Sequence, residues 1–220
     1  MNRLDRGLFA TQPLALDRPP AGPVAGLLFT CLEECFPSDA LLEELTPGAW
    51  IIQRTPGNIV PPYGAGRRDE DELIERAIHE FGIDTLAVCG HLPCAITAHL
   101  ESEAAPDDFL LRDWLAHAEA ARRHALAVPI SRRAHAAAAH NVLVQLANLR
   151  THPAVHAALA AGRLQLCGWL HAGGELRCPG ATADFDRPAA LQPDQNRYLR
   201  RRAVRGRPRL LPALSPPYLA

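Results

Sequence analysis

The segment Cys89-Gly90-His91-Leu92-Pro93-Cys94 brings an imidazole and a thiol together at one place in the chain. A short apolar run from Thr85 precedes it, and an apolar run compatible with a helix follows from Ala95. Read as strand, turn and helix, the segment places His91 and Cys94 at the carboxyl end of a strand. A histidine and a cysteine three positions apart suit one soft or borderline cation, for which zinc is the usual choice.

Tetrahedral zinc needs at least one more protein ligand, and Cys31 is the obvious donor. This cysteine ends the apolar run 24–30, which is predicted to be a buried strand. Proteins with an open parallel sheet bind small molecules and ions beyond the carboxyl ends of the strands. If the two strands are neighbours, Cys31, His91 and Cys94 converge on one metal ion.

Length and composition limit the class of protein. The 220 residues are 48% hydrophobic, which is enough for a sizeable core, and the formal net charge is −1. This balance gives no electrostatic reason to expect nucleic acid or a membrane surface as a partner. No apolar run approaches the roughly 20 residues of a membrane span, and the first residues lack the core of a signal peptide. We therefore expect a cytoplasmic protein, in which the six cysteines serve as ligands and core residues rather than disulfides.

Strand-like apolar runs alternate with segments of helical spacing, which predicts an α/β fold with a mostly parallel central sheet flanked by helices. The chain is divided into an N-terminal arm (1–23), a zinc-binding α/β domain (24–175) and an Arg/Pro-rich C-terminal tail (176–220) that is solvated or wraps a partner. Strands are predicted at 24–30, 49–54, 84–89 and 164–170, and helices at 39–45, 69–81, 107–126, 131–149 and 153–161.

Six collinear segments resemble the β-class carbonic anhydrases. The segment Cys89–Cys94 looks like that family's second zinc motif, and Cys31-Leu32-Glu33-Glu34-Cys35 stands where the family has Cys-x-Asp-x-Arg. Pro47-Gly48 with residues 51–58 is similar to its Pro-Gly-Asp, strand and Arg-Asn-Ala-Gly-Asn stretch. Residues 114–119 and 141–149 match its later helices, and Gly168-Trp169 matches its last strand. The likeness covers about residues 24–175.

The resemblance implies a homodimer or a higher homo-oligomer. It also implies reversible hydration of carbon dioxide to bicarbonate by a zinc-bound hydroxide, with Cys31, His91 and Cys94 as the zinc ligands. Gly57 and Asn58 follow a strand that should flank the site, and they are predicted to bind the substrate.

Two residues depart from the family pattern. Glu33 stands in place of the Asp, and Cys35 in place of the Arg. In the family the Arg holds the carboxylate off the metal by a bidentate salt bridge, and the carboxylate orients the water. Glu33 is longer by one methylene, and no residue evident in the sequence restrains it. We therefore predict that Glu33 orients the hydroxide or gates the metal, and that hydration is weak.

The fourth zinc position leaves the function open at this stage. Water there gives a catalytic site, whereas four protein ligands give a closed, structural one. Either Glu33 or Cys35 could close it, although Cys35 also suits a buried apolar position. The alternative to an enzyme is a non-catalytic zinc-binding homologue with a structural or regulatory role. Hydrolysis of a sulfur analogue of carbon dioxide is a further alternative.

Overall fold

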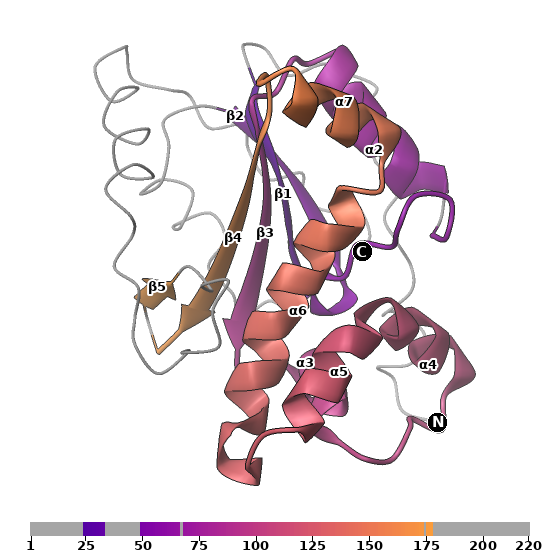
Figure 1. Ribbon diagram of the computed structural model, residues 1–220, viewed down its shortest axis with the longest axis vertical. Coiled ribbons are helices and arrows are strands. Elements are labelled where there is room, and N and C mark those ends of the chain that lie inside the picture. Colours follow the sequence, from indigo (N-terminus) through magenta and orange to yellow (C-terminus); the bar gives the residue numbers. More distant parts are fainter. Residues whose placement is uncertain (1–23, 34–48, 67, 174, 178–220) are drawn as a thin grey trace, which may run out of the picture.

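A computed structural model describes residues 24–33, 49–66, 68–173 and 175–177 of the chain (Figure 1). The predicted N-terminal arm, the predicted helix at 39–45, Cys35 and nearly all of the Arg/Pro-rich tail lie outside these residues. No helix within the described ranges is both long enough and apolar enough to cross a lipid bilayer.

A five-stranded sheet forms the centre of the fold, in the order β2-β1-β3-β4-β5. The first four strands pair in parallel, and β5 adds an antiparallel edge. The predicted α/β fold with a mostly parallel sheet is confirmed. The strands are β1 (Val24–Cys31), β2 (Ala49–Thr55), β3 (Thr85–Leu92), β4 (Gln165–Ala172) and β5 (Glu175–Arg177).

The register of β1 brings the two candidate metal motifs to one edge of the sheet. Thr30 of β1 pairs with Cys89 of β3, and Cys31 pairs with Thr55 of β2 on its other side. Every residue of β1 is buried, as expected for a strand inside a parallel sheet. Because parallel strands end at the same edge, Cys31 and the end of β3 become neighbours.

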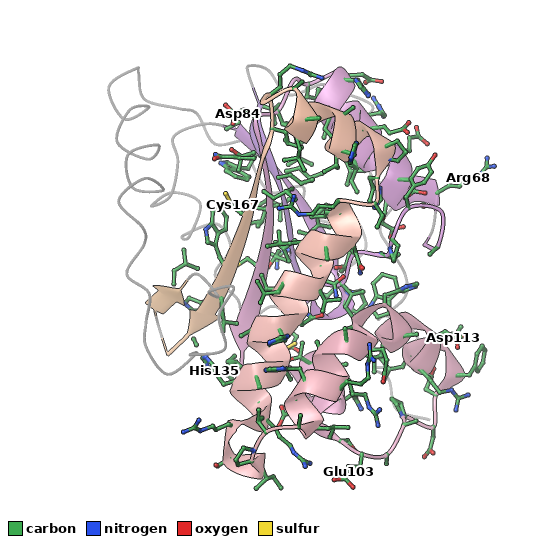
Figure 2. All side chains as sticks on the ribbon, in the orientation of Figure 1. Arg68, Asp84, Glu103, Asp113, His135 and Cys167 are labelled. Atoms are coloured by element: carbon green, nitrogen blue, oxygen red, sulfur yellow. The ribbon has the colours of Figure 1, made fainter. Side chains whose placement is uncertain are left out.

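Helices pack along the sheet and continue beyond the carboxyl ends of its strands. Figure 1 shows α2, α6 and α7 along one side of the sheet, and α3, α4 and α5 grouped near the strand ends. Figure 2 shows the side chains of these helices and of the sheet in the same view. The helices are α2 (Arg68–His79), α3 (Ala95–Ala98), α4 (Phe109–Leu115), α5 (Glu119–Leu126), α6 (Arg133–Leu149) and α7 (Pro153–Ala160).

Two apolar clusters account for most of the packing. The larger one joins β1 and β3 to α2 and α7, with Phe29, Ile74 and Val155 fully buried within it. The second surrounds the thiols at the strand ends, where Leu100 and Leu115 pack with Cys31 and Cys94. The site thiols therefore lie in apolar surroundings.

Strand β5 was not predicted, and the largest boundary differences concern β3 and the helix predicted over 107–126. Strand β3 runs to Leu92, so His91 lies within the strand and not in a turn after it. The single helix predicted over 107–126 is instead α4, the 3₁₀ turn η3 (Ala116–Ala118) and α5. Within η3 the carbonyl of His117 accepts hydrogen bonds from the side-chain amides of Gln145 and Asn148, at 3.4 and 3.1 Å. These bonds compete with the regular helical ladder at that point.

Burial of a histidine in the helical layer has a consequence for acid stability. His140 of α6 stacks on His124 of α5, with ring centroids 3.3 Å apart. Burial and the neighbouring imidazole lower the pKa of His140 below its ordinary value. In the unfolded chain the pKa of this histidine is about 6.5, so below that pH the unfolded state binds more protons than the folded state. The stability contributed by His140 is therefore present above about pH 6.5 and is lost as the pH falls.

We expect the variant His140→Gln to lose less stability than the wild type between pH 7.5 and pH 5.5. Urea unfolding of both proteins in the same buffers measures the difference, and titrating groups away from the His124–His140 pair cancel in the comparison. Identical pH dependences of the two free energies of unfolding would contradict this assignment.

Candidate metal centre

Four side chains with metal-binding atoms meet at the carboxyl ends of β1 and β3. The ligand atoms of Cys31, Glu33, His91 and Cys94 all lie within 4.8 Å of one another. Cys31 ends β1, His91 belongs to β3, and Cys94 directly precedes α3. Both thiols and the imidazole are buried, and Glu33 is half-buried. The structure therefore brings together all three predicted zinc ligands and the predicted catalytic carboxylate.

The separation of the two thiols matches the size of a zinc ion. Cys31 Sγ and Cys94 Sγ are 3.8 Å apart. Two sulfurs bonded to one tetrahedral zinc are also about 3.8 Å apart, since each Zn–S bond is about 2.3 Å. Two thiols and an imidazole are borderline-soft donors, which favour zinc over the oxygen-binding cations calcium and magnesium. The donor set and its spacing thus fit zinc.

The two cysteines differ in how readily each loses its proton. Hydrogen bonding from Cys94 lowers the pKa of Cys31 against the opposing effect of burial, and the backbone of Glu33 and of Gly57 adds to the lowering. The same contact with Cys31, together with burial, raises the pKa of Cys94. A metal ion binds thiolates, so metal binding would release the protons that the two thiols still carry.

His91 binds a proton more readily than its burial alone would allow. Burial acts to lower the pKa of His91, but contact with Cys94 and the charge of Glu33 raise it above the ordinary value. A metal ion competes with that proton for the ring nitrogen, so metal affinity is expected to fall in acid.

The carboxylate of Glu33 is held by a backbone group. Its Oε1 accepts a hydrogen bond of 2.6 Å from the backbone N–H of Ala95, and its Oε2 lies 3.9 Å from His91 Nε2. Sequence analysis found nothing to restrain Glu33, because an amide donor carries no signature in the residue types. The Ala95 amide fixes one oxygen and leaves the other directed toward the cluster.

The segment Gly57-Asn58, predicted to bind the substrate, lies in the buried 3₁₀ turn η1 (Pro56–Asn58) after β2. Both residues have left-handed backbone angles, with φ of 64° and 52°. The backbone of Gly57 hydrogen-bonds toward Cys31, which places the turn against the first thiol. Asn58 is 1% exposed, and its Oδ1 would lie 3.4 Å from a Cβ atom added at Gly90 of β3.

Arg54 is a site neighbour that sequence analysis missed. Its Nη1 donates to the carbonyl of Cys31 at 3.4 Å. Arg54 falls in the stretch that resembles the family's Arg-Asn-Ala-Gly-Asn, but the resemblance assigned a role to a guanidinium only at position 35, whereas this one comes from the adjacent strand β2. The pairing of β1 with β2, which places Thr30 opposite Arg54, is what brings it to the site.

Substitution of Gly57 by alanine is expected to damage both stability and the metal centre. The positive φ costs about 1 kcal/mol or more for a residue with a side chain, and the new Cβ would lie 2.7 Å from Ile96 Cγ2. Together with overpacking, this should lower the free energy of unfolding by about 2–4 kcal/mol. Gly64→Ala is the matched control, since Gly64 has a φ of 73° and nothing within 4 Å of the added Cβ. Urea unfolding and zinc titration measure both effects, and equal losses in the two variants would contradict the steric argument.

Comparison with known proteins gives consistent matches. The family model described as carbonic anhydrase matches residues 27–175. A carbonic anhydrase of Pseudomonas aeruginosa is 41% identical over 135 residues, which are 60% of this chain and 61% of that protein. A carbonic anhydrase of Synechocystis is 31% identical over 211 residues, 88% of this chain and 76% of that one. The aligned part of this chain thus spans less than two thirds of the Pseudomonas protein.

Solved structures show the same architecture. The β-carbonic anhydrase CcaA superposes with a TM-score of 0.64 at 31% identity, over 79% of this chain and 88% of that one. A β-carbonic anhydrase of Sordaria macrospora gives a TM-score of 0.60 at 23% identity, over 73% and 83% of the two chains. The second likeness concerns the fold alone.

Proposed function

The chain belongs to the β-class carbonic anhydrase family, and on that premise we propose that it binds one zinc ion and reversibly hydrates carbon dioxide to bicarbonate. Cys31, His91 and Cys94 would hold the ion. The observation that carries the proposal is the cluster of two thiols, an imidazole and a carboxylate at the carboxyl ends of β1 and β3. Bound zinc would act as a Lewis acid and lower the pKa of a water molecule to about 7.

Glu33 is proposed as the group that accepts a hydrogen bond, and then the proton, from the attacking water. With Oε1 engaged by the Ala95 amide, Oε2 faces the cluster and is placed to accept a hydrogen bond from that water. The backbone N–H of Ala95 holds the carboxylate in position, which is part of the role of the family's arginine. It contributes no positive charge, however, and for that reason we propose a lower rate than in relatives with the Asp–Arg pair.

The surroundings of the thiols suit a small uncharged substrate. Ile59, Leu100 and Leu115 are buried in the apolar cluster that contains Cys31 and Cys94. Apolar walls bind carbon dioxide without hydrogen bonds and keep bulk water away from the reacting atoms. A sulfur analogue of carbon dioxide has the same linear, apolar character, so it should be assayed beside carbon dioxide.

A closed, non-catalytic zinc site is the second candidate function. The observation that favours it is that Glu33 lies within the same 4.8 Å cluster as the three proposed ligands. Four protein donors around zinc leave no position for water. The protein would then keep the family's fold for a structural or regulatory role.

Family membership also supports the proposal of a homodimer or larger homo-oligomer. A cytoplasmic location is proposed separately, because free thiols such as those of Cys31 and Cys94 stay reduced there. Sedimentation of the purified protein gives its assembly state directly, and a monomer at every concentration would argue against this part of the proposal.

Stopped-flow measurement of carbon dioxide hydration tests the proposed function. The zinc-loaded protein is expected to hydrate carbon dioxide faster than the same protein after chelation, and readdition of zinc should restore the rate. Equal rates with and without zinc, in a protein shown to hold one ion per chain, would reject the enzyme in favour of the closed site.

A further inference from the structure

The turn η1 depends on side chains from the helical layer for its hydrogen bonds. The turn closes with a long bond, from Ile59 N to the carbonyl of Pro56 at 3.4 Å. Asn141 Nδ2 of α6 donates to the carbonyl of Gly57 at 2.8 Å, and Trp114 Nε1 of α4 donates to that of Pro56 at 2.9 Å. Two consecutive left-handed residues are unfavourable in isolation, so these outside bonds hold the turn in place.

The amide of Asn141 is itself fixed by a second amide on α6. Gln145, one helical turn further on, donates from Nε2 to Asn141 Oδ1 at 2.8 Å and accepts from Val60 N at 2.9 Å. Both side chains are 0% exposed. Because Asn141 Oδ1 is already an acceptor, its Nδ2 is directed at the carbonyl of Gly57. Buried amides are costly unless hydrogen-bonded, so this network accepts few alternative arrangements.

The turn lies between the elements that carry the two thiols. Cys31 pairs with Thr55, the residue directly before the turn. On the other side, a Cβ atom on Gly57 would lie 2.7 Å from Ile96 of α3, the helix that follows Cys94. The backbone of Gly57 hydrogen-bonds toward the Cys31 sulfur. Displacing the turn would therefore remove a donor from that sulfur.

We propose that Asn141 is a positioning residue of the metal centre, which holds the Gly57 N–H on the Cys31 sulfur by binding the Gly57 carbonyl. This inference rests on the proposed function, since it assumes that Cys31 is a metal ligand. A hydrogen bond to a ligating sulfur fixes its orientation and reduces its donation to the metal, and loss of such a bond typically weakens metal binding about 10- to 100-fold. Gly57 thereby acts on the thiol, whatever contact it makes with the substrate.

The variant Asn141→Leu removes the donor and keeps the number and branching of the side-chain heavy atoms. Asn148→Leu is the control on the same face of α6. Asn148 donates to Val60, His117 and Gln145 Oε1 rather than to the turn, and its removal leaves the bond from Gln145 Nε2 to Asn141 in place. Both variants lose buried hydrogen bonds, so both should unfold at lower urea concentration. Only Asn141→Leu should weaken zinc binding, by about tenfold or more, and shift the thiolate-to-metal charge-transfer bands of the cobalt-substituted protein.

The outcomes separate this inference from the proposed function. If Asn141→Leu keeps the wild-type zinc affinity and cobalt spectrum, or if Asn148→Leu changes them equally, the positioning role is wrong. If the wild type shows no thiolate-to-cobalt bands, the proposed metal site itself is wrong, and this role falls with it. Should Asn141→Leu fail to fold, Asn141→Asp carries the same test, since it keeps the acceptor for Gln145 and loses the donor.

Discussion

Replacing Cys94 by alanine is expected to abolish tight zinc binding and, with it, carbon dioxide hydration. Zinc binding by four protein ligands contributes about 10–16 kcal/mol, so one thiolate is worth roughly 3 kcal/mol or more, which corresponds to at least about a hundredfold in affinity. The sulfur of Cys94 is one of the two whose 3.8 Å separation matches the size of the ion. Competition with a chromophoric chelator measures the affinity, and stopped-flow hydration measures the rate.

Cys89→Ala provides the matched control for this variant. Cys89 lies on the adjoining strand β3, is 0% exposed and packs with Leu28 and Trp169 outside the candidate site. Removing its sulfur should lower the free energy of unfolding and leave zinc affinity unchanged. Retention of wild-type zinc affinity by the Cys94 variant, or an equal loss in both variants, would contradict the proposed ligand set.

Changing Glu33 to glutamine is expected to lower kcat/KM for hydration by about a hundredfold or more. Glutamine keeps an oxygen for the Ala95 amide, which Glu33 binds at 2.6 Å, but it cannot accept a proton at the other position. Zinc content should stay at the wild-type level, because the three proposed ligands are unchanged. The separate measurement of zinc content and rate distinguishes a lost proton acceptor from a lost metal.

The two candidate functions predict opposite signs for this substitution. If Glu33 occupies the fourth coordination position of the metal, its replacement would open that position for water and raise the hydration rate. Glu103→Gln serves as the control, since Glu103 is an exposed carboxylate paired with Arg133 away from the site. An unchanged rate in the Glu33 variant would remove Glu33 from the mechanism.

Strand alternation in the sequence predicts how the candidate site is assembled on the condition that the two strands are neighbours. A buried run ending at Cys31 and another leading to His91 suggest parallel neighbours, and β1 and β3 do pair in that way. The exact end of β3 could not be predicted, because Cys89-Gly90-His91 suits a turn as well as a strand. Pairing along the whole length of β4, as far as Leu92 with Ala172, extends the strand through His91.

The polar network behind the site could not be found from apolar spacing. That spacing predicts one apolar face of the helix from Val142, Leu143, Leu146 and Leu149. Val142 and Leu149 are buried, and Leu143 and Leu146 are half-buried. The amides Asn141, Gln145 and Asn148 recur at helical spacing beside that face, and this is the signal that could have indicated a buried polar contact. Which carbonyls they bind depends on tertiary packing, as does the 3₁₀ turn that interrupts the helix predicted over 107–126.

X-ray absorption at the zinc edge of the loaded protein tests the central claim most directly. We expect two sulfur ligands at about 2.3 Å and two nitrogen or oxygen ligands at about 2.0 Å, which corresponds to Cys31, Cys94, His91 and one further position. A third sulfur would bring Cys35 onto the metal and leave no place for water. Fewer than two sulfurs would contradict the ligand set on which the proposed function rests.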